Sequence, residues 1–105
     1  MAQTQQTEQT LQEARILSKP RAIYTDSARK KGISGTVRLR VVFLASGEIG
    51  DITFVSETSK KGKLTKYGLV EQAIEAAKKI KFTPQIKNGK PITVTKLIEY
   101  NFLLY

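Results

Sequence analysis

The stretch Ile92–Tyr105 reads ITVTKLIEYNFLLY and decides the fold more than any other part of the chain. β-Branched and aromatic residues dominate it, and neither glycine nor proline follows Pro91, a composition typical of a β-strand. Because successive side chains of a strand point to opposite faces, we expect the more apolar face to lie against a helix. The residues of that face are Ile92, Val94, Lys96, Ile98, Tyr100, Phe102 and Leu104.

A β-hairpin is predicted upstream of this strand. Apolar residues recur along Val37–Leu44 with the period of two expected of a half-buried strand. Ala45–Glu48 is a predicted turn, in which Gly47 is free to adopt a positive φ. Ile49–Ser56 then returns as the second strand of the hairpin.

Two helices are predicted, one on either side of the hairpin. The first spans Thr25–Gly32, with a threonine to cap its first N–H groups, three basic residues near its last turn and a glycine at its end. The second spans Leu69–Ile80, where apolar residues recur at helical spacing. The stretch Glu57–Lys66 is polar and basic, and we expect it to be a surface loop. Pro84 excludes further helix, and Asn88-Gly89 marks a turn.

The order of these elements predicts an α+β fold. We expect a three-stranded antiparallel sheet with the main helix packed on one face and a short N-terminal helix. The 105 residues suit one domain. Because the first twelve residues are rich in glutamine and threonine, residues 1–18 are expected to be a flexible N-terminal segment or a linker remnant, which leaves a domain over residues 19–105.

Catalytic and metal-binding chemistry has little support in the composition. The chain contains no cysteine and no histidine, which excludes disulfides, thiolate metal sites and imidazole ligands. Its nine acidic residues are scattered, and no phosphate-binding glycine loop, zinc spacing or nucleophile elbow occurs. We therefore predict that the protein is not an enzyme and holds no cofactor or metal.

The charge balance favours a negatively charged partner. Lys and Arg number 18 against 9 acidic residues, which gives a formal net charge of +9. Basic clusters occur at Lys60–Lys66 and at Lys78, Lys79, Lys81, Lys87 and Lys90. Such runs are usually a solvated face. Exposed aromatic residues are not interleaved with them, so specific nucleic-acid binding is not expected.

No apolar run in the sequence reaches the roughly 20 residues needed to cross a bilayer. Its opening, Met1–Gln6, fits a mature exported chain with an added start methionine, and it equally fits a fragment of a longer membrane-anchored protein. The sequence leaves both interpretations open.

Short motifs follow one another in a characteristic order between Lys19 and Tyr105. Their residues are Pro20, Tyr24, Ala28, Gly35 with Val37, Gly47, Ala73 with Ala76 and Ala77, Phe82 with Pro84, and Phe102. In this order and spacing the chain resembles the TonB C-terminal domain family. Two positions depart from the family pattern: Thr25 stands where a proline is usual, and Ile80-Lys81 replaces a Trp-Arg pair found in many members.

The resemblance implies a periplasmic module that binds an extended peptide by strand addition. Members of the family pair their final strand with the TonB box, a segment at the N-terminus of an outer-membrane transporter, and an inner-membrane motor complex pulls through this linkage. The implied pairing edge comprises Lys96, Leu97, Ile98, Glu99, Tyr100, Asn101, Phe102 and Leu103, and the implied side contacts come from Arg21, Ala22, Ile23 and Tyr24. Membrane contact is expected only through an inner-membrane anchor that these residues do not include.

Elementary geometry supports the same interaction. A long third strand that follows a hairpin lies at an edge of the sheet, where its unpaired N–H and C=O groups can template another chain. Glu99, Asn101 and Tyr105 face away from the helix and are candidates for touching a ligand, with a solvated sheet face as the equal alternative; Tyr100 and Phe102 are expected in the core. The alternative function is a stand-alone structural or assembly module that forms homodimers through this edge.

Overall fold

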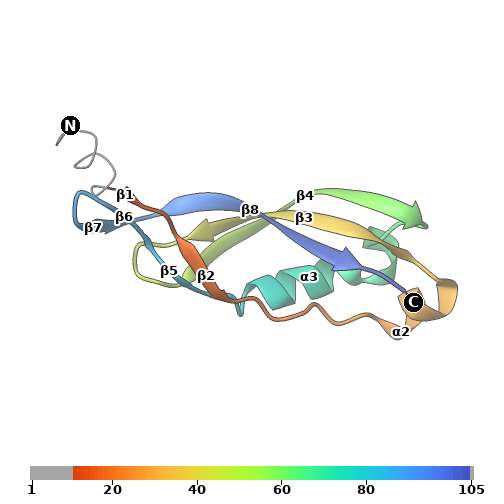
Figure 1. Ribbon diagram of the computed structural model, residues 1–105. Coiled ribbons are helices and arrows are strands. Elements are labelled where there is room, and N and C mark those ends of the chain that lie inside the picture. Colours follow the sequence, from red (N-terminus) through yellow and green to blue (C-terminus); the bar gives the residue numbers. More distant parts are fainter. Residues whose placement is uncertain (1–10, 105) are drawn as a thin grey trace.

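Three antiparallel strands form the main sheet of the computed structural model, which describes residues 11–104 (Figure 1). Their order is β4 (Ile49–Lys61), β3 (Ser34–Phe43) and β8 (Val94–Phe102), so that β3 is central. The remaining elements are β1 (Leu11–Gln12), β2 (Arg15–Ser18), α2 (Asp26–Lys31), the 3₁₀ turn η1 (Thr65–Tyr67), α3 (Leu69–Ala77), β5 (Lys81–Thr83), β6 (Gln85–Lys87) and β7 (Lys90–Ile92).

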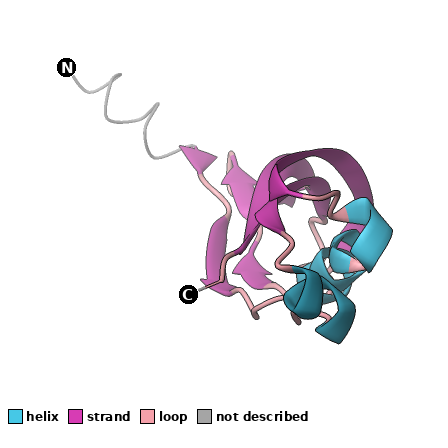
Figure 2. Cartoon of the chain, turned by 90° about the vertical axis from the view of Figure 1, so that its right-hand side faces the viewer, coloured by secondary structure: helices cyan, strands magenta, loops and turns pink. Residues whose placement is uncertain are grey.

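The core lies between one face of the main sheet and α3. Figure 2 shows both helices gathered on one side of the curved strands. Alternate residues of β3 and β8 point toward α3, and α3 meets them with small side chains that allow a close approach. The buried hydrophobic residues of these three elements are Val37, Leu39, Val41, Phe43, Ile98, Tyr100, Phe102, Leu69, Val70, Ala73, Ala76 and Ala77. Ile98, Tyr100 and Phe102, on the predicted apolar face of the last strand, are therefore buried in this core.

Both ends of α2 follow from its sequence. The side chain of Thr25 accepts a hydrogen bond from the backbone N–H of Ala28 at 3.2 Å, which caps the first turn. Gly32 adopts a left-handed conformation and ends the helix. Ala28, within the helix, is the buried residue of α2 and packs in the core.

The main helix is shorter than predicted. It ends at Ala77 rather than at Ile80, because the N–H groups of Lys79 and Ile80 bond to carbonyls only three residues back. Such tightening is common in the last turn of a helix. Ile80 is nonetheless buried, and the chain enters β5 immediately after it.

The α+β class and the antiparallel pairing are confirmed, but the prediction of one sheet is incomplete. β2 pairs with β5 in a second sheet, and β1, β6 and β7 form a third. β4 runs on to Lys61, into the stretch Glu57–Lys66 that was predicted to be a loop, and β8 is shorter than the predicted Ile92–Tyr105. Of the segment 1–18 predicted to be flexible, residues 1–10 lie outside the described residues, as does Tyr105, whereas residues 11–18 contain β1 and β2.

Gly35 allows β3 and β4 to approach closely where they begin to pair. Its φ is +153°, and a Cβ at this position would lie 2.1 Å from the carbonyl oxygen of Thr58. No real Cβ tolerates such a contact, so only glycine fits here. The glycine that marked the start of the strand in the sequence therefore has a steric reason.

Candidate functional site

β8 pairs with β3 on one side only and forms an edge of the main sheet. The side chain of Lys19 donates a hydrogen bond to the backbone carbonyl of Glu99, which must therefore point outward, away from β3. Because the backbone groups of successive strand residues point to opposite sides, those of Leu97 and Asn101 also point outward. The intervening residues, Ile98 and Tyr100, direct their backbone groups to β3 and their side chains to the core.

The β8 edge is regular along its whole length. Nine residue pairs join β3 to β8, from Gly35↔Phe102 to Phe43↔Val94, without a shift in register. A regular edge presents its N–H and C=O groups at the even spacing that a new strand requires. The geometry of β8 is therefore compatible with the addition of a fourth strand.

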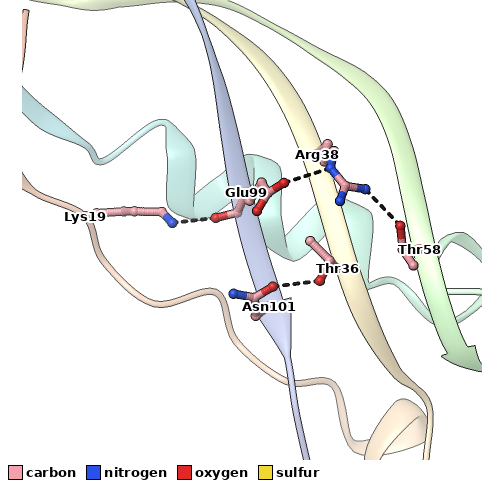
Figure 3. Close-up of polar contacts among 6 residues, drawn as sticks. All are labelled: Lys19, Thr36, Arg38, Thr58, Glu99 and Asn101. Carbon is pink, nitrogen blue, oxygen red and sulfur yellow. Dashed lines mark hydrogen bonds and ion pairs between the residues drawn. The ribbon is translucent and has the colours of Figure 1, made fainter.

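Polar side chains fix the outer face of β8 to the neighbouring strands (Figure 3). The Nε atom of Arg38 lies 2.8 Å from a carboxylate oxygen of Glu99, and its Nη1 donates to the Thr58 hydroxyl at 2.9 Å. The hydroxyl of Thr36 donates to the side-chain oxygen of Asn101 at 2.7 Å. These contacts occupy the side chains of Glu99 and Asn101, and the Glu99 carbonyl already accepts the bond from Lys19.

A groove of about 500 Å³ lies between the C-terminal half of β8 and the extended segment that precedes α2. The residues that line it are Lys19, Pro20, Arg21, Ala22, Tyr24, Arg29, Tyr100, Asn101, Phe102 and Leu103. The structure thus brings together two stretches that the sequence analysis selected separately. A second hollow, lined in part by Ile16, Leu97 and Glu99, also borders β8 and shares Lys19 and Asn101 with the first.

Five of the predicted site residues do not line this groove: Ile23, Lys96, Leu97, Ile98 and Glu99. Leu97, Ile98 and Glu99 line the second hollow instead. Ile23 lines neither, and 69% of its surface is exposed. Lys96 faces another hollow, next to Arg15 and Pro84. The residues that line the groove are therefore only part of the predicted set.

Tyr24 anchors the wall of the groove. Its ring packs edge-on against Phe102, with ring centroids 5.6 Å apart, and its hydroxyl donates to the backbone carbonyl of Ile33. Burial raises the pKa of this hydroxyl, against the opposing effect of the nearby Arg29 guanidinium. Tyr24 thus holds the extended segment at a fixed distance from β8.

Lys19 is a site residue that sequence analysis missed. Its ammonium group lies 4.4 Å from the centre of the Tyr100 ring, in addition to its bond to the Glu99 carbonyl. Desolvation lowers the pKa of Lys19, and the Glu99 carboxylate partly offsets this. The only sequence signal was Pro20, which forces the preceding residue into an extended conformation without indicating where its side chain lies.

Other chemistry finds no support in residues 11–104. No group of three or more acidic side chains in this part of the chain is placed to hold a metal ion. None of its helices combines the length and the hydrophobicity needed to span a membrane.

Comparison with known proteins identifies the family. A model of the family described as "Gram-negative bacterial TonB protein C-terminal" matches residues 20–104. The chain belongs to this family. A solution NMR structure of the Pseudomonas aeruginosa TonB CTD has a similar fold, with a TM-score of 0.65 and 21% sequence identity over 88% of this chain and 87% of that chain. No curated protein matches this sequence.

The TonB assignment confirms the resemblance recognised from the sequence motifs. The matched region begins at Pro20, one residue after the predicted start of the domain. It includes β8 and every residue that lines the groove except Lys19, so nearly all of the candidate site lies within the TonB domain itself.

Proposed function

We propose that this TonB-type domain is a periplasmic peptide-binding module, not an enzyme, that adds an extended segment of an outer-membrane transporter to the outer edge of β8. The linkage would couple transport to energy from the inner membrane. The observation that carries the proposal is a regular, one-sided edge strand that borders a groove.

Backbone bonds supply the affinity in this mode of binding. Leu97, Glu99 and Asn101 each direct one N–H and one C=O outward, and each bond formed contributes about 0.5–1.5 kcal/mol net. Such bonds depend little on the sequence of the partner. The groove beside Tyr100–Leu103 then selects side chains of the bound segment.

Chemical-shift mapping tests the proposal. Isotope-labelled protein is titrated with periplasmic N-terminal peptides of outer-membrane transporters, and amide shifts are expected to concentrate in residues 96–103 and 21–24. The control peptide carries N-methyl groups at alternate residues, which removes its backbone donors while retaining its side chains. Shifts confined to the exposed lysines, or equal binding of the methylated peptide, would refute strand addition.

Self-association through β8 is the second candidate function. The observation that favours it is the same unpaired edge, since two copies related by a two-fold axis can pair their β8 strands into one continuous sheet. Light scattering over a concentration series separates a dimer from a monomer that awaits a peptide.

A further inference from the structure

Seven basic residues gather at one end of the molecule, and we refer to them as the basic tip. They are Arg29, Lys30, Lys31, Lys60, Lys61, Lys63 and Lys66. Each of them is exposed. Figure 1 places α2 and the end of β4, which carry five of these residues, at the same end of the molecule.

Direct contacts hold the two segments of the basic tip together. The hydroxyl of Thr25, at the start of α2, donates to the backbone carbonyl of Tyr67 at 2.8 Å. At the other end of α2, the ammonium group of Lys61 lies 3.3 Å from the position of a Cβ built on Gly32. The loop after β4 therefore runs beside α2, and the position of its lysines relative to those of α2 is fixed by the fold.

The positive charge of the basic tip is not neutralised within the described residues. The stretches that carry it, residues 26–31 and 57–66, contain two acidic residues, Asp26 and Glu57, so these stretches have a net charge of +5 (seven basic minus two acidic residues) out of +9 for the whole chain. Glu57 is occupied, because it accepts hydrogen bonds from the N–H groups of Leu64 and Thr65 at 2.8 and 3.2 Å. The ion pairs found in residues 11–104, Arg38–Glu99 and Lys78–Glu75, lie elsewhere.

The shape of the basic tip favours a surface over a single polymer chain. None of its six lysines lines the four main grooves formed by residues 11–104. A single-stranded nucleic acid needs a groove and exposed aromatic platforms, whereas a plane of phosphate groups needs only exposed cations on long side chains. Lysine ammonium groups act as such point charges.

We propose that the basic tip docks the domain on the phosphate headgroups of an anionic phospholipid membrane. The contact is electrostatic and peripheral. The six lysines of the tip lie outside the groove beside β8, whereas Arg29 lines it. This inference does not depend on peptide binding and can fail or hold independently of it.

Vesicle sedimentation with two matched variants tests the proposal. The tip variant replaces Lys60, Lys61, Lys63 and Lys66 with glutamine, and the control variant replaces Lys79, Lys81, Lys87 and Lys90 in the same way. The two variants lose the same net charge. Arg29 is retained because it also lines the groove. Circular dichroism and thermal melting establish that both variants are folded.

The wild-type protein should sediment with phosphatidylcholine vesicles that contain about one-third phosphatidylglycerol, but not with phosphatidylcholine alone, and binding should weaken steeply with salt. We expect the tip variant to lose about tenfold or more in partitioning and the control variant to lose about threefold or less. Equal losses in both variants would attribute binding to net charge alone and overturn the proposal. A stronger affinity for nucleic acid would also overturn it. This would be the result if the wild-type protein stayed bound to single-stranded DNA at a salt concentration that releases it from the vesicles.

Discussion

The two outer strands of the main sheet, β4 and β8, flank the same central strand but present very different edges. The pairing of β3 with β4 shifts register at three places, and each time the extra residue belongs to β4. The pairing of β3 with β8 contains no shift. Bulges bend and twist a strand, so that its outer edge no longer matches a straight partner. The comparison teaches that this fold protects one edge and leaves the other fit for pairing.

The far end of β4 is also occupied by its own chain. Glu57 accepts two backbone hydrogen bonds from the following loop, and Ser59 donates to the carbonyl of Gly62. Lysines at the end of the strand add repulsion between copies. By contrast, within residues 11–104 the outward backbone of β8 receives one side-chain hydrogen bond, from Lys19 to the Glu99 carbonyl. A side chain can withdraw more readily than a bulge can straighten.

The largest expected effect concerns the bulged pairing of β3 with β4. Replacing Gly35 with alanine places a Cβ 2.1 Å from the Thr58 carbonyl and should lower the free energy of unfolding by about 2–4 kcal/mol. Urea unfolding measures this loss. The control is Gly47→Ala, which shares a positive φ of +94° but has no neighbour within 4 Å, so its loss should be about 1 kcal/mol. Equal losses would mean that glycine is needed at position 35 because of the positive φ, and not because β4 approaches closely.

The second prediction separates the outward from the inward backbone groups of β8. Leu97→Pro removes an outward N–H and should weaken transporter-peptide binding about tenfold or more, with a loss of about 1 kcal/mol or less in folding stability. Ile98→Pro removes an N–H that bonds β3 and should lower the free energy of unfolding by about 3 kcal/mol or more. Calorimetric titration and urea unfolding measure the two quantities. A Leu97→Pro variant that binds normally would show that the partner does not pair with this edge.

The third prediction concerns the residue beneath the β8 edge. Burial raises the pKa of the Tyr100 hydroxyl from 10.0 to about 12, so the folded protein retains this proton at a pH where the unfolded chain has lost it. The protonated Tyr100 therefore leaves the free energy of unfolding unchanged below pH 10. Between pH 10 and 12 the free energy of unfolding should fall by about 1 kcal/mol per pH unit.

Tyr100→Phe removes this dependence and supplies the control. The Tyr100 hydroxyl has no hydrogen-bond partner among the described residues, so at pH 7 the variant should match the wild-type stability within about 0.5 kcal/mol. At pH 11 it should be the more stable protein by about 1 kcal/mol. Urea unfolding at both pH values measures the difference, and parallel loss in the two proteins would place the alkaline titration elsewhere.

The sequence predicted the parts of the fold that depend on local periodicity. The β3 strand, the Thr25 cap and Gly32 end of α2, and the apolar face of β8 all follow from side-chain spacing over a few residues. The β2–β5 sheet depends on pairing between stretches more than sixty residues apart, and β2 itself has a fully exposed pattern with no alternation to detect. Asn88-Gly89, where both residues have a positive φ, connects the two strands of the β6–β7 hairpin. Such a pair is typical of a hairpin turn, but the sequence analysis predicted only the turn and not the two strands.

The candidate site likewise has one part that the sequence predicts and another that depends on tertiary packing. The position of β8 at an edge follows from the order of the elements, and the residues of β8 that line the groove are contiguous in the sequence. Lys19 could not be found, because its role depends on where the extended segment passes Tyr100, and tertiary packing alone sets that path. The bulges of β4 were likewise invisible, since β4 retains a strand-like composition through them.

The smallest expected effect tests whether Lys19 restrains the β8 edge. Lys19→Met keeps the aliphatic stem but removes the donor to the Glu99 carbonyl and a charge that repels a second copy. The freed edge should self-associate more readily, with a dimerisation constant about threefold to tenfold higher, which corresponds to one hydrogen bond. Sedimentation equilibrium over a concentration series measures this change. The matched control is Arg21→Met, which removes the same charge from the same groove, where no hydrogen bond from Arg21 to β8 is found. An equal rise in both variants would assign the effect to charge repulsion. No rise in either variant would mean that the regular edge of β8 does not pair with a second copy.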